Sequence, residues 1–153
     1  MNYTGTGRSN YVKVTDPTKL KLIAAYYNLS VREGDEGRVC ILAMNEGGDM
    51  ENSFFVETEK DFDNMIDLGI LPANTDREEE DVQLPEFDTL LKPLLMDEEI
   101  FIWKHTGSEG SRYLSGWGYA MSNTGETISI SLDDIDAKAS ERWPTAKITD
   151  CSY

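Results

Sequence analysis

The stretch from Asp97 to Ile135 constrains the fold most, because it has the pattern of a three-strand antiparallel meander followed by a helix. Three runs rich in aromatic and β-branched residues, which favour strands, lie in it: Glu98 to Lys104, Arg112 to Met121 and Thr127 to Leu132. Polar segments that contain glycine separate these runs, as turns between antiparallel strands require. The stretch therefore predicts an antiparallel sheet in the C-terminal part of the chain.

Side-chain alternation in the meander predicts which faces are buried. Ile128, Ile130 and Leu132 occupy every second position of the last run, so they share one face and are expected in the core. The middle run has a small-residue face that includes Gly116 and Gly118, and glycines in a strand indicate a close approach by another element. We expect a helix to cover this small-residue face.

The opposite face of the middle run carries Tyr113, Trp117 and Tyr119. Two interpretations stay open for this aromatic face: ordinary ring packing, which is the commoner use of such residues, and a platform for a ligand. The single histidine of the chain, His105, is predicted to lie in the first turn of the meander. A catalytic role for His105 requires a nucleophile and an orienting acid nearby, and the sequence assigns neither.

Capping signals predict where the helices of the N-terminal half begin. Asp16 followed by Pro17 indicates a helix start, because Asp accepts hydrogen bonds from free backbone amides and Pro suits the first helical position. Thr58 and Asp61 have the spacing of a capping box, and Gly69 is expected to end the helix that they begin. Two helices are therefore predicted before residue 70.

Two further helices are predicted on either side of the meander. Pro85 opens a short one that runs to about Met96 and is divided at Pro93, because proline lacks the amide that a helix interior needs. The last helix begins at Asp133 and Asp134, since acids in the first turn are favoured by the helix dipole. Its buried side is predicted to carry Ile135, Ala139 and Trp143.

The rest of the N-terminal half supplies strands and loops. Residues 1–9 are expected to be a flexible lead-in, and residues 10–15 a short alternating strand. Residues 38–44 (RVCILAM) show too little alternation for a half-exposed strand, which indicates a strand covered on both faces, and residues 53–57 are its predicted hairpin partner. The acidic run and flanking prolines of residues 70–84 predict a loop.

This order of elements predicts an α+β fold with mainly antiparallel sheet and four short helices, because no sustained alternation of parallel strands and helices is present. A length of 153 residues fits one compact domain over 1–153, with possible sub-halves 10–69 and 85–143 joined by the acidic loop 70–84. The predicted core residues lie at helical or strand periodicity on apolar faces: Leu20, Ile23, Val39, Ile41, Ile128, Ile130, Leu132 and Ile135.

The sequence predicts a protein that is not an enzyme and has no catalytic residues, no cofactor and no metal site. Cys40 and Cys151 lie in no metal-binding or redox spacing, and phosphate-binding glycine loops and calcium-binding loops are missing. Paired carboxylates are so numerous that choosing two as an acid and a base is arbitrary. No apolar run approaches the ~18 residues of a membrane span and no secretory signal is recognised, so we expect a cytoplasmic protein.

The charge of the chain is uneven. Residues 33–99 hold 21 acids and four bases, a net charge of −17, whereas the remaining segments sum to +2 and the whole chain to −15. An isoelectric point near 4.3 argues against direct nucleic-acid binding, which needs Lys and Arg against phosphate. The acids predicted to bind a partner lie in this negative segment: Glu46, Asp49, Glu51, Glu57, Asp61, Asp63, Asp76, Glu78, Glu79, Glu80, Asp81, Glu86 and Asp88.

Several functions are compatible with this charge pattern. In the first, the acids imitate the phosphates of a nucleic acid and occupy the basic groove of a nucleic-acid-binding protein or ribonucleoprotein. In the second, the protein is an immunity or antitoxin-type partner whose acids cover the basic site of one toxic enzyme. In a third, the charge only keeps an acidic domain soluble. An enzyme that acts on small molecules is a further, weaker alternative.

Two short windows of the chain resemble small acidic proteins carried by bacterial phages and conjugative elements. They are residues 8–16 (RSNYVKVTD), and residues 112–116 (RYLSG) with 130–135 (ISLDDI). The resemblance implies an inhibitor of host defence, of the anti-CRISPR or antirestriction type, that works in the cytoplasm of a bacterial host. DNA mimicry is a recurrent solution among such inhibitors, so the resemblance favours the first of the functions above. It transfers no role to any single residue.

Overall fold

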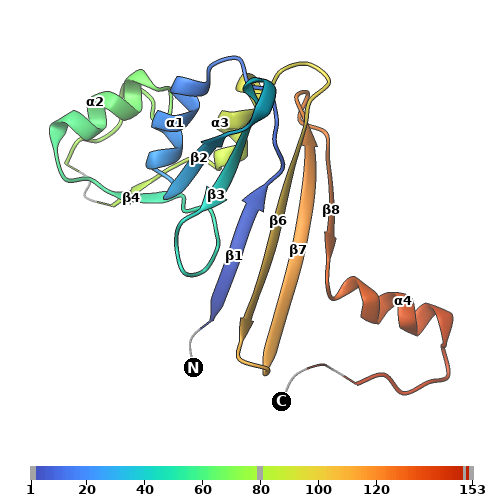
Figure 1. Ribbon diagram of the computed structural model, residues 1–153. Coiled ribbons are helices and arrows are strands. Elements are labelled where there is room, and N and C mark those ends of the chain that lie inside the picture. The colour runs from blue at the N-terminus through green and yellow to red at the C-terminus, as the bar shows by residue number, and fades with distance from the viewer. Residues whose placement is uncertain (1–2, 79–80, 150, 152–153) are drawn as a thin grey trace.

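One antiparallel sheet of six strands organises the chain, as a computed structural model that describes residues 3–78, 81–149 and 151 shows (Figure 1). Its strands are β1 (Thr4–Ser9), β2 (Leu29–Glu33), β3 (Val39–Ala43), β6 (Ile100–Glu109), β7 (Tyr113–Ser122) and β8 (Thr127–Ser131). They lie in the order β2-β3-β1-β6-β7-β8, and every neighbouring pair is antiparallel. Strands from both predicted sub-halves, 10–69 and 85–143, belong to this sheet.

The first strand is an unpredicted element. Residues 4–9, expected to be part of a lead-in, form β1 at the centre of the sheet, between β3 and β6. β1 pairs with β6 at six positions, from Thr4 with Ser108 to Ser9 with Trp103. The predicted strand at 10–15 is reduced to two isolated bridges, at Val12 and Val14. The pairing partner of β1 lies about 100 residues away, so local pattern gives no sign of it.

The glycines of β1 permit a close crossing of two backbone segments. A Cβ atom on Gly7 would lie 2.1 Å from the carbonyl oxygen of Gly48, and one on Gly5 would lie 2.2 Å from that of Gly47. The amide of Gly5 donates to the carbonyl of Glu46 at 2.7 Å. The turn after β3 therefore presses directly against β1, and only residues without a side chain fit there.

The pairing of β3 differs from the prediction. Residues 39–43 do form a strand that is buried over its first three residues, as expected. The predicted hairpin partner at 53–57 is wrong, because β3 pairs with β2 and β1, whereas β4 (Ser53–Phe55) pairs with β5 (Asp81–Gln83) in a separate two-stranded sheet. β5 also places a short strand within the predicted loop 70–84. A short connection, residues 34–38, joins β2 to β3, whereas a longer one, residues 44–52, separates β3 from β4. β2 therefore takes the edge of β3 that the sequence assigned to residues 53–57.

The four helices begin close to their predicted positions: α1 (Pro17–Ala25), α2 (Glu59–Asp67), α3 (Phe87–Leu91) and α4 (Asp134–Arg142). Asp16 caps α1 by accepting from the amide of Lys19 at 3.0 Å. A 3₁₀ turn, η2 (Lys92–Leu94), follows α3 at Pro93, as the proline predicts. A second 3₁₀ turn, η1 (Asp35–Gly37), lies between β2 and β3.

The hydrophobic core lies between the helices α1 to α3 and one face of the sheet (Figure 1). Trp103 and Phe101 of β6 are fully buried there together with Tyr27 and Phe87, whose rings meet edge to face at 5.3 Å. Four of the predicted core residues are confirmed, each with at most 1% of its surface exposed: Leu20, Ile23, Val39 and Ile41. The chain is therefore a single α+β domain. Its main core lies where α1 to α3 pack on the sheet, and β6 contributes Phe101 and Trp103 to it.

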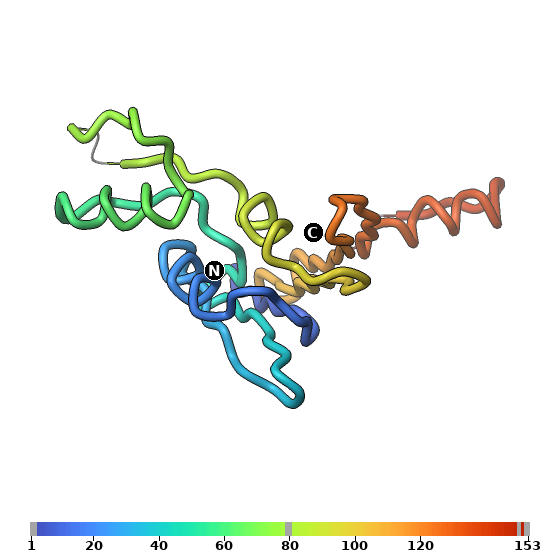
Figure 2. Tube along the Cα trace, turned by 90° about the horizontal axis from the view of Figure 1, so that it is seen from above, coloured from blue at the N-terminus to red at the C-terminus, as the bar shows by residue number. Residues whose placement is uncertain are grey.

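The C-terminal end of the sheet is open, contrary to the prediction. Ile128 and Ile130 of β8 are 72% and 74% exposed, and Leu132 and Ile135 are also exposed. Trp143, predicted on the buried side of the last helix, is exposed as well. Figures 1 and 2 show α4 extending away from the strands past β8, so it does not cover the small-residue face of β7. Alternation identified the apolar face correctly, but it did not show that no described element covers this face.

Candidate functional site

The negative charge gathers in a segment that we call the acidic lobe, residues 53–83, comprising β4, α2, the connection after it and β5. The lobe holds ten acids and two bases, a net charge of −8. In Figures 1 and 2, α2 and this connection lie side by side and project from the molecule on the side opposite to α4. Phe62 and Met65 of α2 are buried, which fixes the opposite side of the helix toward solvent.

The outward side of α2 is a row of carboxylates. Glu59, Asp63 and Asp67 recur every four residues and are all exposed. Residues four apart on a helix lie on one side, about 6 Å apart along its axis. Across from this row, the connection and β5 carry the exposed acids Asp76 and Asp81. The lobe therefore presents two lines of negative charge on a folded framework.

Arg77 joins the connection after α2 to α2 itself. Its Nη1 atom lies 3.0 Å from Oε2 of Glu59 and 2.8 Å from Oδ1 of Asp63. The hydrogen bonds to Asp63 and then Glu59 raise the pKa of the Arg77 guanidinium. One cation shared by two carboxylates leaves the lobe strongly negative, and it also holds the connection against α2.

Asp61 has a structural role in the lobe. Its Oδ2 atom accepts from the amides of Glu57 at 3.1 Å and Thr58 at 3.0 Å, as the capping-box prediction requires. Because this carboxylate is already engaged at the start of α2, the acids free to meet a partner are its neighbours. Charge-reversal experiments on the lobe therefore leave Asp61 unchanged.

The structure brings only some of the predicted partner-binding acids together. Those in the acidic lobe are Glu57, Asp61, Asp63, Asp76, Glu78 and Asp81. Glu79 and Glu80 lie outside the described residues. Two lobe acids, Glu59 and Asp67, were not predicted, although their four-residue spacing from Asp63 is a sequence signal that identifies them.

The other predicted acids lie elsewhere. Glu46, Asp49 and Glu51 belong to the turn after β3, where Asn45 binds the Asp49 carbonyl at 2.8 Å and Oε1 of Glu51 at 3.1 Å. This turn crosses β1, and hydrogen bonds within it hold its acidic residues in place. Glu86 occupies the N-cap position of α3 without a capping hydrogen bond from its side chain, and Asp88 lies in the first turn. These five acids are not part of the lobe.

His105 lies in strand β6 and not in a turn as predicted, and it is only 3% exposed. Its Nε2 atom is 2.8 Å from the hydroxyl of Tyr3, and its Nδ1 atom is 3.1 Å from the carbonyl oxygen of Gly48. The ring stacks on Trp117 with centroids 5.2 Å apart. Oδ1 of Asp49 lies 3.5 Å from Nδ1. These contacts hold β1 and the turn after β3 in place, which gives His105 a structural function.

The side chains on the aromatic face of β7 become more exposed from Tyr119 to Tyr113. Tyr119 is half-buried and meets Phe101 edge to face at 6.0 Å, and burial, with Asp88 and Glu86 nearby, raises the pKa of its phenol. Trp117 stacks on Tyr119 at 6.3 Å and is 40% exposed, whereas Tyr113 is 45% exposed. Ring packing accounts for Tyr119 and Trp117, so this face is an extension of the core more than a separate platform.

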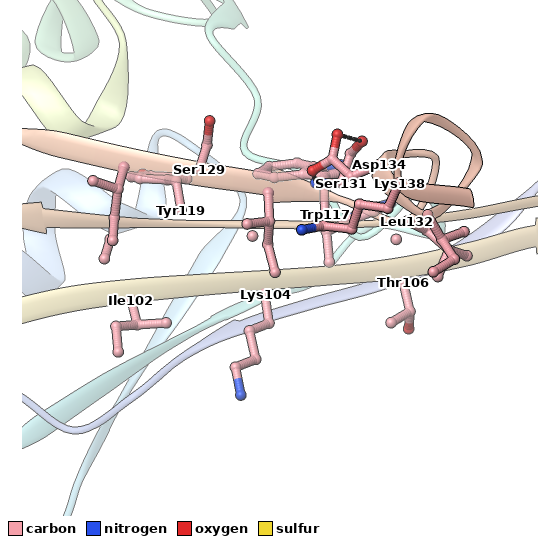
Figure 3. A pocket seen from close by; sticks show the side chains of 17 residues that line it. Ile102, Lys104, Thr106, Trp117, Tyr119, Ser129, Ser131, Leu132, Asp134 and Lys138 are labelled. Carbon is pink, nitrogen blue, oxygen red and sulfur yellow. Dashed lines mark hydrogen bonds between the residues drawn. The ribbon is translucent and has the colours of Figure 1, made fainter. Parts of the chain in front are cut away.

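A groove of about 680 Å³ lies on the other face of the meander; we call it the C-terminal groove. Its floor is the small-residue face of β7, at Gly116, Gly118 and Ala120, and residues of β6, of β8 and of the N-terminal half of α4, among them Ile102, Ile130 and Ile135, border it. Figure 3 shows Ile102, Lys104 and Thr106 on one side of the strands and Trp117 and Tyr119 on the other. The groove is thus the uncovered back of the sheet.

The described residues offer surfaces for binding, and comparison with known proteins assigns the chain to no family. Among the described residues, no group of three or more His, Cys, Asp or Glu side chains is placed to hold a metal ion. No described helix combines the length and apolar character needed to cross a bilayer. No protein-family model, curated protein or solved structure matches the chain. The acidic lobe and the C-terminal groove are therefore the two candidate functional surfaces.

Proposed function

We propose that this protein is an inhibitor that binds a basic nucleic-acid groove through its acidic lobe. The observation that carries the proposal is the two lines of exposed carboxylates on α2 and on the connection and β5, held together by Arg77. Carboxylates fixed on a folded framework present charge at regular intervals, as a nucleic-acid backbone does. A partner that evolved to bind phosphates then binds the lobe.

The projection of the lobe supports mimicry over an immunity-type function. A lobe that stands out from the sheet, as in Figures 1 and 2, enters a groove, whereas covering a protruding basic site requires a hollow surface. The C-terminal groove and a second hollow beside Tyr11 and Arg38 are not lined by the acids of the lobe. An acidic domain that is merely soluble has no need to gather net charge −8 in 31 residues.

The resemblance of residues 8–16, 112–116 and 130–135 to proteins of phages and conjugative elements supports a particular class of partner. In this proposal the partner is a nucleic-acid-binding defence complex of a bacterial host, either a restriction enzyme or a CRISPR effector, and inhibition takes place in the host cytoplasm. The protein competes with nucleic acid for one groove and binds no nucleic acid itself.

Competition for DNA tests the proposal directly. Type I restriction enzymes and guide-loaded CRISPR effectors are incubated with labelled target DNA and increasing amounts of the protein, and bound DNA is measured by gel shift. We expect displacement of DNA by the parent protein that weakens as salt increases, because exposed charges are screened over about 8–10 Å. Displacement from no complex would remove the proposed function.

A charge-matched pair of variants locates the surface. The first changes four exposed lobe acids to Lys: Glu57, Asp67, Glu78 and Asp81. The second makes the same net change at four exposed acids outside the lobe: Asp35, Glu36, Glu46 and Glu98. Exposed charge pairs are each worth roughly 0.2–1 kcal/mol, so the lobe variant is expected to inhibit roughly 10- to 100-fold less well. Equal inhibition by the two variants would show that total charge, and not the lobe, is recognised.

A further inference from the structure

The N-terminal half of α4 borders the C-terminal groove at Ile135 and Lys138, but the helix then extends past it (Figure 1), and both the groove and the apolar side of α4 are uncovered among the described residues. Ile135 of α4 and Trp143, the residue that follows the helix, are 61% and 59% exposed, and Ile130 beside the groove is 74% exposed. We propose that α4 of one copy fills the C-terminal groove of a second copy, and the reverse, in a two-fold dimer. This inference is independent of the proposed function, because it uses the opposite side of the molecule (Figure 2).

A partner for α4 is required by the physics of short helices. α4 has nine residues, whereas isolated helices shorter than about 12–15 residues are marginal in water. Helices of this length are stabilised by packing an apolar side against another element. The residues on one side of α4 are Ile135, Ala139 and Trp143, at spacings of four, and Ile135 and Trp143 are exposed. Another surface must therefore cover this side.

The groove has the dimensions and shape of a helix seat. Nine helical residues span about 13.5 Å, and the floor from Gly116 to Ala120 spans about 14 Å along β7. A Cβ atom on Gly118 would lie 3.1 Å from the carbonyl oxygen of Trp103, so the floor is kept low by the absence of side chains. Small floor residues between larger aliphatic side chains leave a trough in which the ridge of a helix fits.

Local hydrogen bonds set the direction of α4, so that only its N-terminal half borders its own groove. The carboxylate of Asp134 accepts from the amide of Ser131 at 2.8 Å and from its hydroxyl at 3.2 Å. These bonds fix the angle between the end of β8 and the start of α4, and the helix then extends beyond β8 in both views (Figures 1 and 2). β8 is the edge strand of the sheet, so the direction of α4 leads to where a second molecule would pack beside that edge.

Charge also favours a second copy at this end of the molecule. Residues 100–153 have a net charge of only −2, although the chain carries −15, so the strong repulsion between copies comes from the distant acidic part. Residues 133–143 have a net charge of −2. On β6, Lys104 borders the groove, and it pairs across the sheet with Arg8. The acidic α4 of a second copy would therefore lie near two basic side chains.

The oligomeric state of the full chain tests the inference. By sedimentation velocity at about 100 μM, well above a micromolar dissociation constant, the parent protein is expected to be a dimer. Ile130→Asp places a charge beside the groove and is expected to give a monomer with an unchanged circular dichroism spectrum, because Ile130 is already exposed within its own chain. Leu22→Asp makes the same chemical change on exposed α1 and should leave the dimer intact. A monomeric parent, or a dimer that Ile130→Asp leaves intact, would overturn the proposal.

A cysteine pair identifies which copy supplies the helix. In a Cys151→Ser background, Ala120→Cys on the groove floor and Ala139→Cys on α4 are combined and oxidised with diamide. Reciprocal exchange predicts a covalent dimer on a non-reducing gel, and each single-cysteine variant is the control. A disulfide that forms only within one chain would mean that α4 folds back on its own sheet, and the dimer model would be wrong.

Discussion

Glu99 joins three segments that are distant in the sequence, and its removal should weaken the fold by a measurable amount. Its Oε1 atom accepts from the amide of Lys13 at 2.7 Å and from Nη1 of Arg38 at 2.5 Å. The side chains of Glu99 and Arg38 are 16% and 35% exposed. The backbone bond from Lys13, followed by the charge of Arg38, lowers the pKa of the Glu99 carboxyl. The fold therefore favours the ionised form.

Glu99→Gln keeps the shape of this side chain and removes its charge. A hydrogen bond to a charged group contributes about 1.5–3 kcal/mol and a neutral one about 0.5–1.5, so two bonds lose roughly 2 kcal/mol before screening. Partial exposure of Arg38 reduces this loss to about 1–2 kcal/mol. For a chain of this size, a loss of that order lowers the melting temperature by roughly 3–6 °C at pH 7.

The pH dependence gives this prediction its sign. Because the native pKa of Glu99 is lowered, its contribution is fully present above the unfolded pKa of about 4.3 and is lost as pH falls through the native pKa. The difference between thermal melts of parent and Glu99→Gln should therefore shrink as the pH falls from 7.5 to 3. Dilute samples are needed, since net charge vanishes near the isoelectric point of 4.3.

Glu33→Gln is the matched control for Glu99→Gln. Glu33 also binds a cation, Lys21, at 2.7 Å, and the pKa of its carboxyl is lowered by that contact. Both of these side chains are exposed, at 68% and 45%, so the pair should add nothing measurable to the melting temperature. If Glu99→Gln melted like the parent at pH 7, or if its difference from the parent did not shrink as the pH fell, the electrostatic explanation would be refuted.

Two further substitutions test the fold. Gly7→Ala should destabilise the protein by about 2–3 kcal/mol in urea unfolding, because its Cβ would lie 2.1 Å from the carbonyl oxygen of Gly48, whereas Gly116→Ala, with 3.6 Å to the nearest atom, should be tolerated. Asp16→Ala removes the cap of α1 and should cost about 1 kcal/mol; Asp16→Asn, which can still accept from Lys19, should recover most of that loss in the same assay.

The elements that sequence analysis located correctly have local causes. α1 begins at Asp16 because a side chain three residues away satisfies a free amide, and Pro93 divides α3 from η2 because of its own ring. The meander follows the same rule, since its strands are joined by short turns. Each of these features is decided within a few residues, so the pattern in the sequence contains it.

The elements that were wrong depend on distant partners. β1 has a composition unlike a strand and exists because β6 pairs with it, and residues 53–55 pair with β5 because β2 already occupies β3. The burial of Ile128 and Ile130 was predicted from alternation, which shows that a face is apolar but not what covers it. For the candidate site, the clustering of acids was visible in the sequence, while the row along α2 and the bridge by Arg77 needed the fold.

The central place of β1 sets the order in which the sheet is completed during synthesis. β1 meets β3 at a single register position and β6 at six, so one of its edges stays open until residues 103–108 have been made. At about 5–20 residues per second, the roughly 100 intervening residues take on the order of 5–20 s. An open edge in a nascent chain invites pairing with the wrong strand. The TGTGRS sequence of β1 contains two glycines and no large apolar residue, so the composition that makes this strand hard to predict also makes it a weak template for wrong pairing before β6 is made.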